Sequence, residues 1–258
     1  MPARILVTDN LEKTAIRSNR IIVRMPKDSL DAADGSYSSP PSSIEENYQV
    51  ELVRKAIHFC SLSIPIVYFF VSRSTALTIL IPLTAAFFIV DVARYYHSGI
   101  AQWFASTFGW LLRSHEHGVM KKRLNGATYI LLSAIICVLL FPKLITVTAF
   151  AILIISDITA ALVGRKFGRH RFFTKTWEGS VAFFVSSIVV VAVTPKFGGS
   201  FGEYLIGIVG GAVGTVIEAI SIYVDDNLST PIAIGATMWL LYTAFYPSLE
   251  ITKFAYVS

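Results

Sequence analysis

The sequence is poor in charged side chains. Asp, Glu, Lys and Arg make up 15% of its 258 residues, whereas an ordinary soluble domain has roughly 25%. Hydrophobic residues reach 54% and the mean hydropathy is +0.61, which is more apolar surface than a soluble domain of this size needs. The composition excludes an ordinary soluble domain and predicts an integral membrane protein.

Cysteine is scarce as well. Cys60 and Cys137 lie inside apolar runs, and neither has a second cysteine or a histidine at metal-ligand spacing. We expect small buried thiols at both positions, with no role as metal ligands.

The first 47 residues lack the apolar runs found in the rest of the chain. They are polar, carry charges of both signs, include a Ser- and Pro-rich segment at 34–43, and contain no stretch that resembles a signal peptide. We expect residues 1–47 to form a disordered cytoplasmic tail. Residues 48–258 are then the transmembrane domain, which we expect to carry any catalytic activity.

Long apolar runs fill the remainder of the chain, and most approach the ~20 residues that cross a bilayer core as a helix. Because backbone groups in lipid must be hydrogen-bonded within the segment, the runs predict helices and an all-α fold with about seven transmembrane helices. The stretch 98–118 predicts an interfacial amphipathic helix, with an eighth span as the alternative. The seven runs are 52–71, 75–93, 125–141, 144–163, 179–194, 203–224 and 229–247.

Basic residues are distributed unevenly between the predicted loops. With seven spans and a cytoplasmic amino terminus, 18 of the 22 Lys and Arg residues lie on the cytoplasmic side. Without the six in the tail, 12 remain inside and four outside. Since positive charge marks the cytoplasmic side, we expect the carboxyl terminus outside. The net charge of +5 then reflects contact with lipid headgroups, and we expect no nucleic-acid partner.

Glycines repeat along one predicted helix. Gly207, Gly210, Gly211 and Gly214 form two overlapping small-xxx-small steps. They predict close packing against a neighbouring helix of the bundle, and a homodimer stays open as an alternative.

Ionisable residues inside apolar helices are energetically costly, so they are functional candidates. Glu51, Lys55 and His58 share one face of the first predicted helix. A membrane-surface anchor with an incidental ion pair would explain Arg54 and Lys55. It would not explain His58, which lies about two turns into the span.

Carboxylates make up the next candidates. Asp157 follows an apolar run and either binds Mg²⁺ or pairs with a basic residue of the next loop. Glu218 and Asp225 are seven residues apart, which predicts one helix face. With Asp226 and Asn227 they predict a divalent-metal or phosphate–metal site. A simple turn would explain Asp226 and Asn227, but not Glu218 within the span.

A glycine-containing basic loop is predicted between Val163 and Ser180. It carries five Lys and Arg residues, and its glycines let backbone N–H groups approach phosphate oxygens. The next helix is predicted to begin near Thr176, and its positive end favours an anion. A merely basic loop would not explain the carboxylate that enters the next span, and the spacing is not that of a P-loop. The residues concerned are Gly164, Arg165, Gly168, Lys175, Thr176, Glu178, Gly179 and Ser180.

These groups together resemble a known enzyme family. The motifs are Glu51…Arg54-Lys55…His58, Asn125-Gly-Ala-Thr-Tyr129, Asp157, the run from Gly164 to Ser180, and Glu218…Asp225-Asp226-Asn227. In this order, over roughly 50–247, they resemble the CTP-dependent lipid-alcohol kinases: dolichol kinase, phytol kinase, farnesol kinase and CTP-dependent diacylglycerol kinase.

The Gly-x-x-x-Gly…Lys-Thr-x-Glu-Gly stretch is also similar to phosphatidate cytidylyltransferases. Those enzymes carry a carboxyl-terminal run with a Lys-Asp followed by His-Gly-Gly and Asp-Arg. This chain has no His-Gly-Gly and ends in Phe-Ala-Tyr-Val-Ser. The departure favours the kinase, with the cytidylyltransferase as the alternative.

The resemblance implies a Mg²⁺-dependent kinase that transfers the γ-phosphoryl group of CTP to a membrane lipid alcohol. A rival from another class is a non-enzymatic membrane transporter, whose charged residues would line a path across the bilayer instead of gathering at one face. In the kinase hypothesis the metal ligands are Asp157, Glu178, Glu218, Asp225 and Asp226. The nucleotide is held by Lys55, Gly164, Arg165, Gly168, Lys175, Thr176, Gly179, Ser180 and Asn227, and a carboxylate or His58 accepts the hydroxyl proton.

Overall fold

The computed structural model describes residues 53, 55–108, 124–221 and 224–247. The chain divides into two units, residues 1–43 and 44–258, and all described residues belong to the second. The predicted tail 1–47, Glu51, Arg54 and the second half of the predicted interfacial segment therefore lie outside the described residues.

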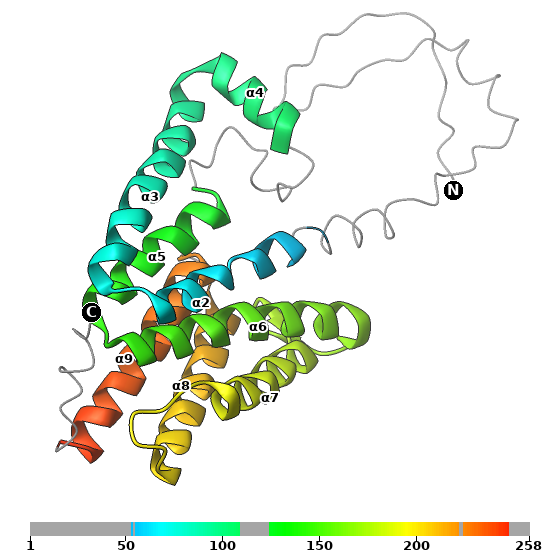
Figure 1. Cartoon of the computed structure of the whole chain (residues 1–258). Coiled ribbons are helices and arrows are strands. Elements are labelled where there is room, and N and C mark those ends of the chain that lie inside the picture. Colours follow the sequence, from blue (N-terminus) through cyan, green and yellow to red (C-terminus); the bar gives the residue numbers. More distant parts are fainter. Residues whose placement is uncertain (1–52, 54, 109–123, 222–223, 248–258) are drawn as a thin grey trace, which may run out of the picture. The chain divides into compact units, whose positions relative to one another are not determined.

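The described part is almost entirely helical (Figure 1). Residues 55–60 are helical and precede α2, so that Lys55–Phe70 forms one short apolar helix interrupted by a turn at 61–62. In chain order the elements are α2 (Ser63–Phe70), α3 (Arg73–Tyr96), α4 (Ser98–Phe108), α5 (Gly126–Leu140), α6 (Lys143–Phe167), β1 (Arg171–Phe172), β2 (Lys175–Thr176), α7 (Trp177–Val193), α8 (Phe201–Ile220) and α9 (Asp226–Phe245).

The predicted apolar runs correspond to the observed helices, so the all-α fold is confirmed. Four helices, α3, α6, α8 and α9, are long and apolar enough to cross a membrane. The helix Lys55–Phe70, α5 and α7 are shorter apolar helices. The helix α4 begins the segment that we predicted to be interfacial. Together they form a helical membrane bundle.

The helix α6 is the central element of the bundle. It packs against α2, α7 and α9, and 72% of its apolar window is buried, compared with 22% in α3. Figure 1 shows α7 running beside α6, and α8 lies between α7 and α9. The polar residues of α6 are therefore enclosed by other helices, and Asp157 is one of them.

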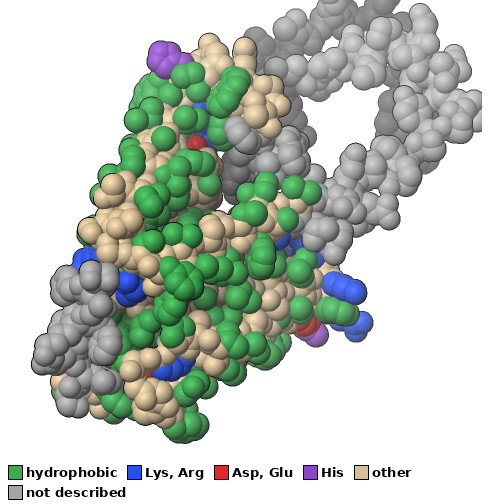
Figure 2. Space-filling view, in the orientation of Figure 1, with side chains coloured by type: hydrophobic (Ala, Val, Ile, Leu, Met, Phe, Trp, Pro, Cys, Tyr) green, Lys and Arg blue, Asp and Glu red, His purple; other side chains and the backbone are tan. Residues whose placement is uncertain are grey.

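The outer surface of these helices is largely hydrophobic. Figure 2 shows hydrophobic side chains spread across the visible face with few charged groups among them. Phe70, Ile89 and Leu240, for example, are 80%, 64% and 67% exposed. Exposed apolar surface of this extent fits a lipid environment. Cys60 is also exposed, so our expectation of a buried thiol was wrong there, whereas Cys137 is buried.

The glycine stripe of α8 faces its neighbours within the bundle. A Cβ atom at Gly207 would lie 2.6 Å from Val191 of α7, and one at Gly214 would lie 2.7 Å from Ile234 of α9. Real Cβ contacts are not this short, so side chains at these positions would push the helices apart. The predicted close packing within the bundle is therefore observed.

Candidate active site

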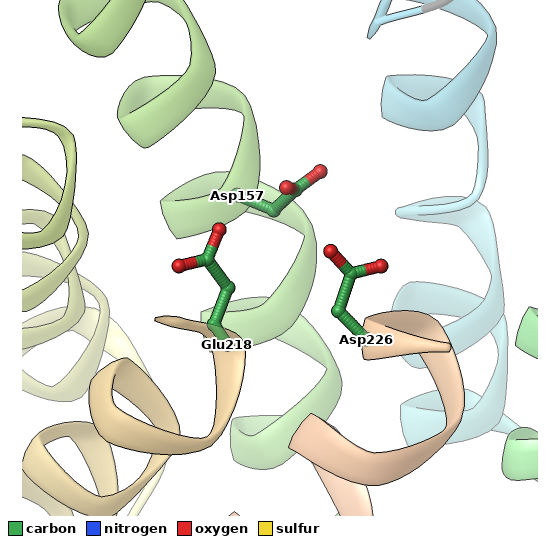
Figure 3. A group of neighbouring side chains, drawn as sticks. All are labelled: Asp157, Glu218 and Asp226. Carbon is green, nitrogen blue, oxygen red and sulfur yellow. The ribbon is translucent and has the colours of Figure 1, made fainter. Parts of the chain in front are cut away.

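Three carboxylates from three helices converge at one end of α8. Asp157 lies in α6, Glu218 in the last turn of α8, and Asp226 is the first residue of α9. One oxygen atom of each lies within 4.8 Å of the others, and Figure 3 shows the side chains pointing toward a common space. We call these residues the carboxylate cluster. Asp157 and Glu218 are only 8% and 2% exposed, so nearby cations are needed to offset the repulsion.

Two lysines provide these cations. Lys55 Nζ donates a hydrogen bond to Asp157 Oδ2, and Lys175 Nζ lies 2.6 Å from Glu218 Oε1 and 3.0 Å from Asp226 Oδ2. Burial alone would lower the pKa of the Lys175 ammonium, but the Asp226, Glu218 and Asp157 carboxylates outweigh burial and raise it. Lys175 therefore stays charged at neutral pH.

His58 approaches the same cluster. Its Nε2 atom lies 3.4 Å from Asp157 Oδ2, and its side chain is 10% exposed. Lys55 and His58 are three residues apart in the helical segment 55–60, so one helix face brings both to Asp157. The structure therefore brings together Lys55, His58 and Asp157 from the set that the sequence singled out.

A pocket of about 690 Å³ opens beside the carboxylate cluster, a volume within the usual range for small-molecule sites. Its basic lining suits a polyanion, because five Lys and Arg side chains meet only two carboxylates there. The lining residues that carry charge are Lys55, Arg165, Arg169, Arg171, Lys175, Asp157 and Glu218.

A short hairpin brings Lys175 to the carboxylates. The strands β1 and β2 pair antiparallel, and Thr174 donates hydrogen bonds from its backbone N and its Oγ1 to the carbonyl oxygen of Ala219, at 3.3 and 2.8 Å. Ala219 follows Glu218 in α8, so this contact holds Lys175 next to Glu218. At the hairpin turn, Phe173 has a φ of 50°, a conformation usually left to glycine. Docking on α8 offsets that strain.

Glycines set how closely α6, the hairpin and α7 approach one another. A Cβ at Gly164 would lie 2.8 Å from Thr176 Oγ1, and one at Gly168 would lie 2.7 Å from Thr176 Cγ2. Thr176 also caps α7, because its Oγ1 accepts a hydrogen bond from Gly179 N. The next helix thus begins where we predicted. Our expectation of a loop from Val163 onward was wrong, because α6 continues through Gly164 to Phe167.

Two predicted metal ligands lie outside the carboxylate cluster. Glu178, in the first turn of α7, has its Oε1 atom 2.9 Å from His170 Nδ1. Asp225 caps α9, because its Oδ1 accepts hydrogen bonds from Asn227 N and Nδ2 at 3.0 and 2.7 Å. Our prediction that Glu218 and Asp225 share one helix face was wrong, since α8 ends before Asp225. Asp226 meets Glu218 instead.

A second buried polar group surrounds Asp91 of α3, which is fully buried. Its Oδ2 accepts hydrogen bonds from Asn125 N at 2.8 Å and Thr128 Oγ1 at 2.6 Å. Arg94 Nε lies 3.3 Å from its Oδ1. The resemblance drew attention to Asn125-Gly-Ala-Thr-Tyr129, but we did not single out Asp91. The signal was available, because Asp91 is a carboxylate within an apolar run.

The fold and this site define a helical membrane protein with an ion-paired carboxylate cluster beside a basic pocket. The chain belongs to the family of the uncharacterized protein RP860 of Rickettsia prowazekii. The two are 30% identical over 204 residues, which cover 78% of this chain and 97% of the rickettsial protein. A phytol kinase of Synechocystis is 34% identical over 93 residues, covering 32% of this chain and 38% of that enzyme. No family model and no solved structure matches the chain.

Proposed function

We propose that the chain is a CTP-dependent kinase that phosphorylates a membrane lipid alcohol of the polyprenol, phytol or diacylglycerol type. The observation that carries the proposal is the carboxylate cluster with its two lysines beside a basic pocket, at one end of an apolar bundle. The partial similarity to a phytol kinase supports the same class of reaction.

In this reaction the lipid hydroxyl oxygen forms a bond to the γ-phosphorus of CTP. The bond from that phosphorus to the β–γ bridging oxygen breaks, and CDP leaves with the electron pair. The hydroxyl proton passes to a base, for which His58 and the carboxylate cluster are the candidates. His58 is well placed because Asp157 can stabilise a protonated imidazole 3.4 Å away.

The basic lining of the pocket would bind the triphosphate. Arginine side chains donate paired hydrogen bonds to phosphate oxygens, and a buried lysine adds a fixed positive charge. Arg165, Arg169 and Arg171 lie on the lining with Lys175. Gly168 and Thr176, the cap of α7, lie on the same lining.

Mg²⁺ fits the donor set of the carboxylate cluster. The three side chains offer oxygen ligands only, which Mg²⁺ prefers. Glu218 Oε2 is buried and has no hydrogen-bond partner among the described residues, so it has a free ligand position. Asp157, Glu218 and Asp226 would hold the ion, which neutralises charge on the transferred phosphoryl group when bound. Glu178 contacts His170 and Asp225 caps α9, so we do not include either among the ligands of the ion.

We place all seven apolar helices across the membrane, with the amino terminus and the site on the cytoplasmic side. The distribution of Lys and Arg supports this orientation. The site would then open where cytoplasmic CTP and the hydroxyl end of a membrane lipid meet.

The test is transfer of label from CTP to lipid by the purified full chain in detergent. We expect label from the γ-position of CTP, and none from the α-position, in at least one of a polyprenol, phytol or a diacylglycerol. Passage of α-label into phosphatidate would instead identify a cytidylyltransferase. Asp157→Asn is the matched inactive control.

Further outcomes separate the remaining alternatives. Transfer from ATP in preference to CTP would retain the kinase and overturn the choice of nucleotide. If no lipid alcohol accepts label and the Asp157→Asn protein behaves like the wild type, the enzyme proposal fails, and a non-enzymatic membrane protein is the better description.

A further inference from the structure

One oxygen atom of each carboxylate in the cluster is already engaged by a lysine. Lys55 binds Asp157, and Lys175 binds both Glu218 and Asp226. Figure 3 shows how the three carboxylates surround one space, and both ammonium groups are directed at these carboxylates. A cation that enters this space alone must compete with two ammonium groups for the same three carboxylates. Repulsion between the cation and the ammonium groups adds to that cost, because burial limits screening by water.

The charge of the site points to a particular ligand. Among the described residues, the five Lys and Arg side chains of the pocket and the three carboxylates of the cluster leave two positive charges. A nucleoside triphosphate carries about four negative charges near neutral pH, and its complex with one divalent cation carries about two. The net charge of the complex therefore balances the net charge of the site. The metal alone would leave excess positive charge, and the bare triphosphate would leave excess negative charge.

Lys175 is placed to respond to both components. Its Nζ atom contacts two carboxylates, and the same side chain lines the pocket beside Arg171 and Thr174. Lys55 likewise contacts Asp157 and lines the pocket. A phosphate oxygen in the pocket can therefore accept hydrogen bonds from these ammonium groups without any movement of the backbone segments that carry the two lysines.

We infer that the site binds its divalent cation and its polyphosphate together, as one chelate. Lys55 and Lys175 pair with the carboxylates that would bind the cation, until phosphate oxygens accept the hydrogen bonds of the two lysines. The inference rests on the proposed function for the identity of the polyphosphate. The exclusion of free metal by the lysines depends only on the observed ion pairs.

The experiment measures Mn²⁺, as a probe for Mg²⁺, bound to the full chain in detergent by equilibrium dialysis, and the complex of Mn²⁺ with polyphosphate in the protein-free chamber is subtracted. For the wild type we expect binding at least about tenfold tighter when inorganic triphosphate or a non-hydrolysable CTP analogue is present. For Lys175→Met we expect Mn²⁺ binding without polyphosphate to become about tenfold tighter, and the gain from polyphosphate to shrink.

Matched variants control for charge and for folding. Lys166→Met removes an exposed lysine near the pocket that does not line it, and it should leave Mn²⁺ binding unchanged. Lys175→Arg keeps the charge and should keep the wild-type response. Elution as a single peak shows that a variant is folded, and Lys55→Met replaces Lys175→Met if that variant aggregates.

Two results would overturn the inference: equal Mn²⁺ affinity of the wild type with and without polyphosphate, or no gain in free-metal affinity in a folded lysine variant. Failure of the proposed function gives a different result. In that case Mn²⁺ and triphosphate bind together as described, but no lipid alcohol accepts label from CTP.

Discussion

The helix α8 carries a buried glutamate at each end, and the two are held in opposite ways. Glu203 accepts hydrogen bonds from Phe197 N, Gly198 N and Ser200 N at 2.7, 3.0 and 3.0 Å, and from Tyr242 Oη at 3.2 Å. Glu218 has one oxygen bound to Lys175 and the other without a partner among the described residues. A satisfied carboxylate stabilises a loop, whereas an unsatisfied one beside a pocket is available to a ligand.

The largest expected effect is a loss of phosphoryl-transfer activity when Glu218, but not Glu203, is replaced. Glu218→Gln should lower γ-phosphoryl transfer by at least about 100-fold, because it removes a charged ligand beside the reacting phosphate. The free energy of unfolding should change by less than about 1 kcal/mol, since the substitution also relieves repulsion within the carboxylate cluster. Initial rates and denaturant titration measure the two quantities. Retention of more than a tenth of the activity would remove Glu218 from the site.

At the amino-terminal end of α8 we expect the converse effect, a loss of stability without a loss of activity. Glu203→Gln should lower the free energy of unfolding by about 2–3 kcal/mol, because three backbone donors of the loop 197–200 lose a buried, charged acceptor. The activity of each folded molecule should stay within about twofold of the wild type, because Glu203 lies at the other end of α8 from Glu218 and does not line the pocket. Tyr242→Phe removes a single donor and should cost about 1 kcal/mol. A loss of activity without a loss of stability in Glu203→Gln would contradict the comparison.

The loops at the two ends also differ in backbone strain. Before α8, the residue with positive φ is Gly199, at 73°, whereas the hairpin docked on the carboxyl end of α8 has Phe173 at 50°. Gly199→Ala should lower the free energy of unfolding by about 1 kcal/mol, because alanine is strained there. Phe173→Gly should not lower it by more than about 0.5 kcal/mol, since relief of strain offsets the greater freedom of the unfolded chain. Thermal unfolding of both variants checks the pair.

The lysines near the two ends of α8 should have pKa values displaced in opposite directions from the ordinary lysine pKa. Burial lowers the pKa of Lys196, and the Glu203 carboxylate only partly opposes it. The pKa of Lys175 is raised, as described above. Stability from Lys175 is therefore fully present below pH ~10.4 and is lost only above it, whereas Lys196 makes the fold gain stability as pH rises toward ~10.4. Carbon-13 methylation followed by NMR reports both, and a Lys175 signal that titrates before that of Lys196 would contradict the assignment.

Much of the fold could be predicted from apolar length alone. The run 203–224 anticipates α8, and 144–163 anticipates α6, because a chain in lipid must satisfy its backbone internally. Helix ends were less predictable. The apolar run continues to residue 224, so we predicted that Glu218 and Asp225 share a helix face, although α8 ends at Ile220 and Asp225 caps α9.

The residues of the candidate site could be predicted where an ionisable side chain lies in an apolar run, because burying its charge costs free energy. Lys55, His58, Asp157 and Glu218 stand out as ionisable residues in apolar runs, and the structure brings all four together. The roles of the adjacent residues Asp225 and Asp226 could not be separated, because capping of α9 depends on backbone angles at its first turn. The Ser200-x-x-Glu203 capping box was a readable signal that we did not use.

The crossing of α6, the hairpin and α7 has a consequence for how substitutions are tolerated. At Gly164 and Gly168 even alanine would force the structure to shift, because the added Cβ would lie less than 3 Å from the Thr176 side chain and, at Gly168, closer still to the carbonyl oxygen of Gly164. A library of all single substitutions should therefore show a narrow intolerant stretch in a polar, largely exposed segment, where tolerance is ordinarily high. Such a map, scored only by the amount of folded protein in the membrane, would locate the edge of the pocket before any substrate is known.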